Sequence, residues 1–121
     1  MKLIAKKIPL KELEKMAKDK FGNLVKAVVD VEKEVMVVDA ELHSDEEAHL
    51  LSQGSKQENL WGINLYPELE GEDFIEFDSV INVRPSFGNS SRGVDDPKIR
   101  EELVKIVEKL IEKPVVSSSN P

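Results

Sequence analysis

Val25-Lys26-Ala27-Val28-Val29-Asp30-Val31 is the stretch of sequence that decides the fold. Apolar residues fill its odd-numbered positions, which is the period of two of a β-strand with one buried face. A polar turn, Glu32-Lys33-Glu34, follows, and the apolar residues then lie at even-numbered positions: Met36, Val38, Ala40 and Leu42. The pattern predicts an antiparallel hairpin that turns one face inward.

A second hairpin is predicted further along the chain. The runs 60–66 and 74–84 are both rich in β-forming residues and both end at a proline. An acidic turn, 68–73, joins them. In the second run the polar residues share one face, and they are Glu76, Asp78, Asn82 and Arg84.

Three helices complete the prediction, at about 9–21, 45–53 and 97–112. Ser44 and Glu47 have the spacing of a capping box for the second helix, and Asp96 is the expected N-cap of the third. The order α-β-β-α-β-β-α favours an α+β two-layer domain with a mainly antiparallel four-stranded sheet. We expect a single domain over residues 1–113 and a flexible C-terminal tail over 114–121.

Composition excludes several classes of protein. The net charge of −7 argues against a nucleic-acid partner bound through a broad basic surface. The absence of cysteine excludes disulfides and thiol chemistry and is typical of a cytoplasmic protein. No apolar run has the length of a signal-peptide core or a membrane span. Glutamate and lysine greatly outnumber glutamine, a balance typical of proteins from hot environments.

Several runs resemble those of an uncharacterised family of small bacterial and archaeal proteins, a domain of unknown function. The runs are 24–30, 54–57, 60–67 and 81–85, together with Gly88-Asn89 and Ser91-Arg92. The resemblance extends over about residues 8–110 and implies a complete single-domain chain. It implies no activity, cofactor or functional residue.

The segment 84–100 holds all three arginines of the chain, Arg84, Arg92 and Arg100. A guanidinium is favoured where a planar fork binds a carboxylate or phosphate. Small and hydroxyl-bearing residues between the arginines suit close approach of an anion, so the candidate anion-binding residues are Arg84, Ser86, Asn89, Ser90, Ser91 and Arg92. Two alternatives stay open: Arg84 and Arg92 tie the loop down internally, or the segment forms a protein interface.

A second candidate group contains a histidine. At strand spacing Asp39, Glu41 and His43 project from one face, and Asp45 follows on the next helix. Carboxylates beside an imidazole suit acid–base chemistry, so His43, Glu41 and Asp45 are weak catalytic candidates, with Arg84 positioning an anion. The alternative is a solvated strand face. No established metal motif is present, and we predict no metal and no cofactor.

The prediction that follows is a small binding or interaction module, self-associating, whose polar sheet face recognises a small anionic ligand. A small hydrolase or metal-dependent enzyme that uses Glu41, His43 and Asp45 is the first alternative. A structural homo-oligomer without a ligand site is the second. We expect no enzymatic activity, no nucleic-acid partner and no membrane partner.

Overall fold

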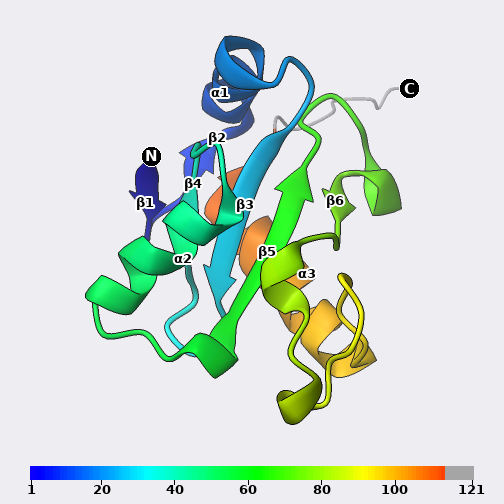
Figure 1. The fold of residues 1–121 in the computed structure, drawn as a ribbon. Coiled ribbons are helices and arrows are strands. Elements are labelled where there is room, and N and C mark those ends of the chain that lie inside the picture. Colours follow the sequence, from blue (N-terminus) through cyan, green and yellow to red (C-terminus); the bar gives the residue numbers. More distant parts are fainter. Residues whose placement is uncertain (114–121) are drawn as a thin grey trace.

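The computed structural model describes residues 1–113, and the predicted tail, 114–121, lies outside the described residues. A five-stranded antiparallel sheet has the order β1-β4-β3-β5-β6 (Figure 1). Its strands are β1 (Lys2–Ile4), β3 (Val25–Asp30), β4 (Val35–Val38), β5 (Leu60–Leu65) and β6 (Ile75–Glu76). A small parallel pair joins β2 (Ile8–Pro9) to β7 (Ile111–Glu112). The α+β prediction is confirmed, but the sheet has an unpredicted edge strand, β1, which is too short to show a period.

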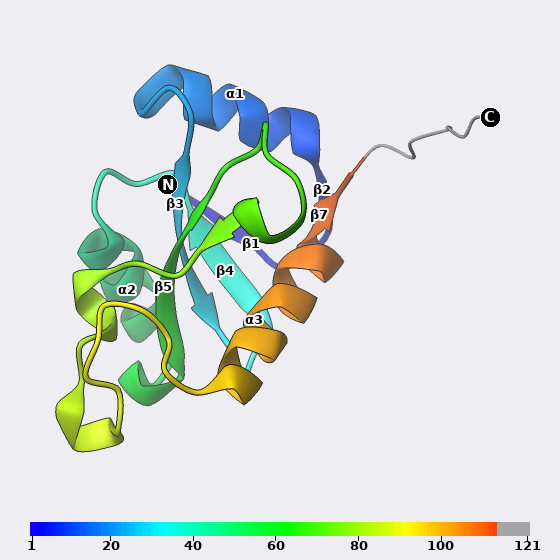
Figure 2. The same ribbon diagram turned by 90° about the vertical axis from the view of Figure 1, so that its right-hand side faces the viewer.

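Three helices pack against the sheet, close to the predicted positions: α1 (Leu10–Lys20), α2 (His43–Ser52) and α3 (Pro97–Leu110). Figure 2 shows α1 and α3 on one side of the sheet and α2 on the other. Asp96 caps α3 as predicted, because its carboxylate accepts a hydrogen bond of 2.9 Å from the Lys98 amide. The capping box is wrong: α2 begins at His43, so Ser44 already lies inside its first turn.

Apolar side chains fill both sides of the sheet. The larger core lies beneath α1 and α3, whereas a smaller one beneath α2 contains Val28, Val37, Leu50 and Leu60. The expected sheet with a single apolar face is therefore wrong. In the sequence Val28 and Val37 lie on the second face of the predicted hairpin, where the period of two predicts polar residues. In the structure α2 covers this face and buries both valines.

The predicted strand 74–84 forms only as β6, and 3₁₀ turns at Val80–Asn82 and Pro85–Phe87 replace the remainder. A side chain takes the place of the missing strand. Asn82, fully buried, accepts from the Gly62 amide through Oδ1 at 2.9 Å and donates to the Gly62 carbonyl through Nδ2 at 2.9 Å. Gly62 has to be glycine here, since a Cβ would lie 2.6 Å from the Ser79 Cβ. This arrangement keeps 79–82 tight against β5.

Candidate functional site

Arg84 belongs to the interior of the protein. Its side chain is buried and donates to the main-chain carbonyls of Gln57 and Leu60, the latter at 2.8 Å. The guanidinium carbon lies 4.3 Å from the centre of the Trp61 ring, a cation–π contact. Burial lowers the pKa of Arg84. These contacts fix Arg84 to the start of β5. We call residues 85–96, between Arg84 and α3, the arginine loop.

The loop that follows Arg84 is organised by its own polar groups. Asn89 is buried, and its amide nitrogen donates to the carbonyls of Asn82, Ser91 and Gly93. The carboxylate of Asp95 accepts from the Ser90 amide at 3.0 Å and from the Ser91 hydroxyl at 2.5 Å. These hydrogen bonds lower the pKa of Asp95. The donors expected for an external anion at Ser90 and Ser91 therefore bind a carboxylate of the chain itself.

The two remaining arginines are both exposed and differ in their hydrogen-bond partners. Arg100 donates to the Val94 carbonyl at 3.1 Å. Arg92 is exposed, and its Nε donates to Asp78 Oδ1 at 2.6 Å. This hydrogen bond lowers the pKa of Asp78 and raises that of Arg92. Within residues 1–113 the Arg92 side chain makes no other hydrogen bond, so its terminal amino groups are available to a ligand. Ser86 is exposed in the 3₁₀ turn that follows Arg84.

His43 lies over β5 from the first turn of α2. Its ring is buried, and Nε2 lies 2.8 Å from the Ile63 carbonyl oxygen. Because a carbonyl only accepts, Nε2 carries the proton and Nδ1 the lone pair. The pKa of His43 is lowered, chiefly because the ring is buried. The hydrogen bond to Ile63 raises this pKa, and the positive charge of nearby Lys26 lowers it. The ring is therefore neutral near pH 7.

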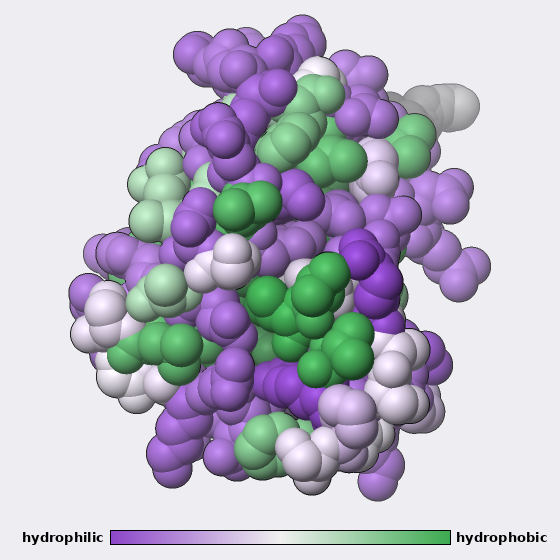
Figure 3. All heavy atoms as spheres, viewed as in Figure 1, coloured by the Kyte–Doolittle hydropathy of each residue, from purple (hydrophilic) through white to green (hydrophobic). Residues whose placement is uncertain are grey.

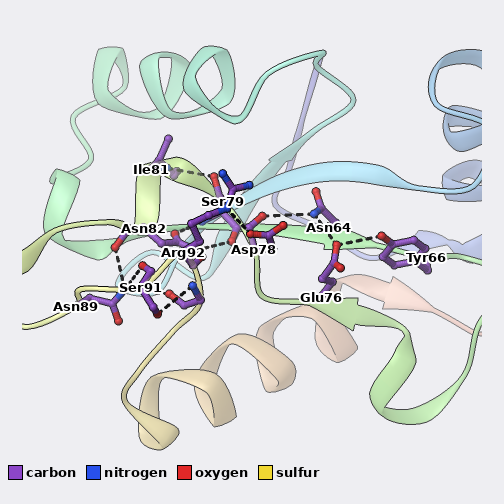
Figure 4. Close-up of polar contacts among 12 residues, drawn as sticks. Asn64, Tyr66, Glu76, Asp78, Ser79, Ile81, Asn82, Asn89, Ser91 and Arg92 are labelled. Atoms are coloured by element: carbon purple, nitrogen blue, oxygen red, sulfur yellow. Dashed lines mark hydrogen bonds and ion pairs between the residues drawn. The ribbon is translucent and has the colours of Figure 1, made fainter.

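Asn64 connects β5 to the segment after β6. Its amide nitrogen donates to Glu76 Oε1 at 2.9 Å and to the Asp78 carbonyl at 3.4 Å, and the Tyr66 hydroxyl reaches the same Glu76 oxygen (Figure 4). Since both partners of the Asn64 nitrogen are acceptors, Oδ1 must point the other way. Lys26 faces Asn64 across the strand pair. We call Lys26, His43, Asn64, Asp78 and Arg92 the polar cluster.

The polar cluster contains only part of the predicted site. His43 and Arg92 lie in it, whereas Glu41 and Asp45 are exposed and, in the part of the chain that the structure describes, make no hydrogen bond or ion pair with His43. The strand ends at Val38, and Asp39 takes a left-handed φ of 70°, so positions 39, 41 and 43 do not alternate on one face. No catalytic grouping of Glu41, His43 and Asp45 is assembled.

Arg84 lies apart from the cluster, against Leu60 at the beginning of β5, whereas His43 contacts Ile63. Sequence reasoning did not select Lys26 or Asp78 as functional residues. The available signal was weak: Lys26 occupies a polar position of the first predicted hairpin, and Asp78 lies on the polar face of the predicted strand 74–84.

A buried acid lies near the cluster on α2. Glu46 is fully buried, and its Oε2 accepts from the Ala40 amide at 3.0 Å. Its other oxygen, Oε1, has no hydrogen-bond partner within residues 1–113. Burial raises the pKa of Glu46 to about 9, so this carboxyl group is protonated at neutral pH. It is a structural acid whose ionisation the fold opposes.

The comparisons with known proteins identify a family whose function is unknown. The profile of a family described as a protein of unknown function (DUF5674) matches residues 2–110. No curated protein and no solved structure shows significant similarity to the chain. Across residues 1–113, no three acidic or histidine side chains are grouped so that they could hold a metal ion. No helix in the same range has the length and apolar character needed to cross a membrane.

Proposed function

The chain belongs to the DUF5674 family, and we propose, from the geometry of its polar cluster, that it is a binding module for a small anionic ligand. The observation that carries the proposal is the charge around His43. Lys26 forms no ion pair among residues 1–113; its Nζ lies 5.5 Å from the centre of the Phe21 ring, a cation–π contact that uses none of its N–H donors. Arg92 engages Asp78 through a single nitrogen. Two cations with free donors beside a buried neutral ring stand out in a protein of net charge −7.

The chemistry of these groups favours an oxyanion. The terminal amino groups of Arg92 suit a planar or tetrahedral oxyanion, and the Lys26 ammonium adds a point charge. His43 Nδ1 becomes a donor when it takes up a proton. Asp78 holds Arg92 in place, because one of its oxygens already accepts from Nε. The cluster thus offers donors from β3, α2 and the arginine loop to one small ligand.

We expect sulfate, phosphate and acetate to shift the amide NMR resonances around Lys26, His43 and Arg92 in a saturable way. Saturation matters because sulfate stabilises proteins in general by exclusion from their surface. Arg92→Gln removes a charge-assisted contact and should weaken binding about tenfold. Arg100→Gln, a change at an exposed arginine bonded to the Val94 carbonyl, is the matched control and should bind normally. Unsaturable, scattered shifts with all three anions would overturn the proposal.

Anion affinity should also depend on pH through His43. The pKa of His43 is below its ordinary value of 6.5 in the free protein, and an adjacent anion favours the charged ring and raises that pKa. Binding therefore takes up a proton, so affinity rises as pH falls from about 8 to about 5, by up to tenfold per unit. Sulfate keeps its charge over this range, and the lowered pKa of Asp78 keeps that carboxylate ionised.

Sulfate titrations at several pH values test this expectation. His43→Gln should bind sulfate with an affinity that no longer changes with pH, whereas His49→Gln, at the other histidine, should behave as the parent protein does. Equal affinity of the parent protein at pH 5 and pH 8 would show that His43 does not take part.

Broader expectations from the sequence accompany this proposal. We infer a cytoplasmic protein from the absence of cysteine, and thermophilic origin from the glutamate and lysine content. A melting temperature below about 60 °C would contradict thermophily. Self-association also stays a prediction, and light scattering that finds only monomers at high concentration would contradict it.

A further inference from the structure

An exposed apolar patch borders the polar cluster. It consists of Val80, which is 67% exposed, Val83, which is 42% exposed, and the half-buried Ile81 between them. Figure 3 shows apolar side chains gathered in the middle of this face, surrounded by hydrophilic atoms. Apolar side chains that collect on an exposed surface mark binding sites more often than scattered ones do.

The patch and the cluster are held together by Arg92. The Arg92 carbonyl accepts from the Ser79 amide at 2.9 Å and from Asn82 Nδ2 at 2.9 Å. Its guanidinium binds Asp78, the residue directly before this turn. Figure 4 shows the Arg92 side chain beside Ser79 and Asp78. A cation with free donors therefore lies at the border of the patch, on the side of the polar cluster.

We propose that the ligand is a small carboxylate with an apolar tail, whose head group binds Arg92 and Lys26 and whose tail covers Val80, Ile81 and Val83. This inference rests on the proposed function and adds the chemical class of the ligand. Charge complementarity selects this occupant over a second copy of the chain. A symmetric pair through the patch would bring Arg92 close to its own counterpart and join two chains of net charge −7.

A homologous series of carboxylates tests the inference. Affinities for acetate, butyrate, hexanoate and octanoate, each below its micelle concentration, are measured by NMR titration. A fully buried methylene raises affinity about fourfold, and a tail lying on an open patch is half covered, so we expect about twofold per methylene. The affinity should thus rise steeply from acetate to octanoate.

Variants at exposed positions keep the test clear of folding effects. Val80→Ser, alone or with Val83→Ser, should flatten the dependence on chain length and leave acetate affinity unchanged. Leu69→Ser is the matched control, because Leu69 is an exposed apolar residue outside the patch, and it should leave the slope intact. Arg92→Gln should weaken the whole series about equally, by about tenfold.

The outcomes separate this inference from the proposed function. If acetate and sulfate bind at the cluster but octanoate binds no better, the apolar tail is wrong and anion binding stands. If none of the anions binds, the proposed function fails first. If the protein is a dimer that Val80→Ser dissociates, a second copy covers the patch and the inference is overturned.

Discussion

Asn82→Ala should lower the free energy of unfolding by about 3–4 kcal/mol, the largest loss that we expect from a single polar residue. The side chain is fully buried and makes three hydrogen bonds, two with the backbone of Gly62 and one with the Arg92 carbonyl. Alanine leaves the Gly62 amide and carbonyl buried without partners, and each such group costs about 1–3 kcal/mol, with incomplete additivity. The Arg92 carbonyl loses one donor but keeps the Ser79 amide. Urea unfolding of the parent and variant proteins measures the difference.

Two further substitutions sharpen this prediction. Asn82→Asp keeps the acceptor for the Gly62 amide but places a second oxygen against the carbonyls of Gly62 and Arg92. It should lower the free energy of unfolding at least as much as alanine does. The loss should grow as pH rises, because the buried carboxyl group is harder to ionise in the folded chain. Asn23→Ala, at an exposed asparagine after α1, is the control and should change stability by less than about 0.5 kcal/mol. A loss below about 1 kcal/mol for Asn82→Ala would mean that water or a local shift replaces the missing amide.

Glu46→Gln should stabilise the protein at pH 8, by up to about 5 kcal/mol. The pKa of Glu46 is about 9 in the fold, against an ordinary value of 4.5. Below pH 4.5 the carboxyl group is protonated in both folded and unfolded chains and has no effect. Between those two values the unfolded chain loses its proton while the folded chain keeps it, so stability falls as pH rises. Glutamine does not titrate and avoids this loss.

The measurement is the free energy of unfolding at pH 5 and at pH 8 for both proteins. The two should be similar near pH 5 and diverge toward pH 8, since only the parent protein loses stability through Glu46. Glu41→Gln, at an exposed glutamate a few residues earlier, is the matched control. It keeps Glu46 and should lose stability between pH 5 and pH 8 as the parent protein does. Equal pH dependence of Glu46→Gln and the parent would show that Glu46 ionises freely.

Local patterns predicted most of the elements but not how the sheet is covered. The period of two in 25–31 and the proline at the first position of α3 correspond to real elements, because each depends on neighbours within a few residues. The coverage of both sheet faces depends on where α2 packs, and only Val28 and Val37 hinted at it. The run 74–84 alternates like a strand, yet Asn82 and the close approach of Ser79 to Gly62 break it.

The candidate site was predictable only in part, for the same reason. His43 and Arg92 stood out by residue type, since histidine and arginine are rare in this chain. Their link to Lys26 and Asp78 depends on the register of β3 against β5 and on the turn at 79–82, which no local spacing encodes. Glu46 lies in the polar run 44–47 at the start of the predicted helix, where an exposed side chain is expected. Its burial follows from the packing of α2 against the sheet, which the sequence did not predict.

The part of the β5 edge that β6 leaves uncovered also bears on aggregation. An open strand edge presents amides and carbonyls that can template a strand from another chain. Along the outer edge of β5, Asn82 occupies both backbone groups of Gly62, and Arg84 occupies the Leu60 carbonyl. Backbone groups that are already hydrogen-bonded to these side chains cannot pair with an incoming strand. The stretch of β5 from Leu60 to Gly62 is therefore closed to pairing with a strand of another chain, although β6 does not cover it.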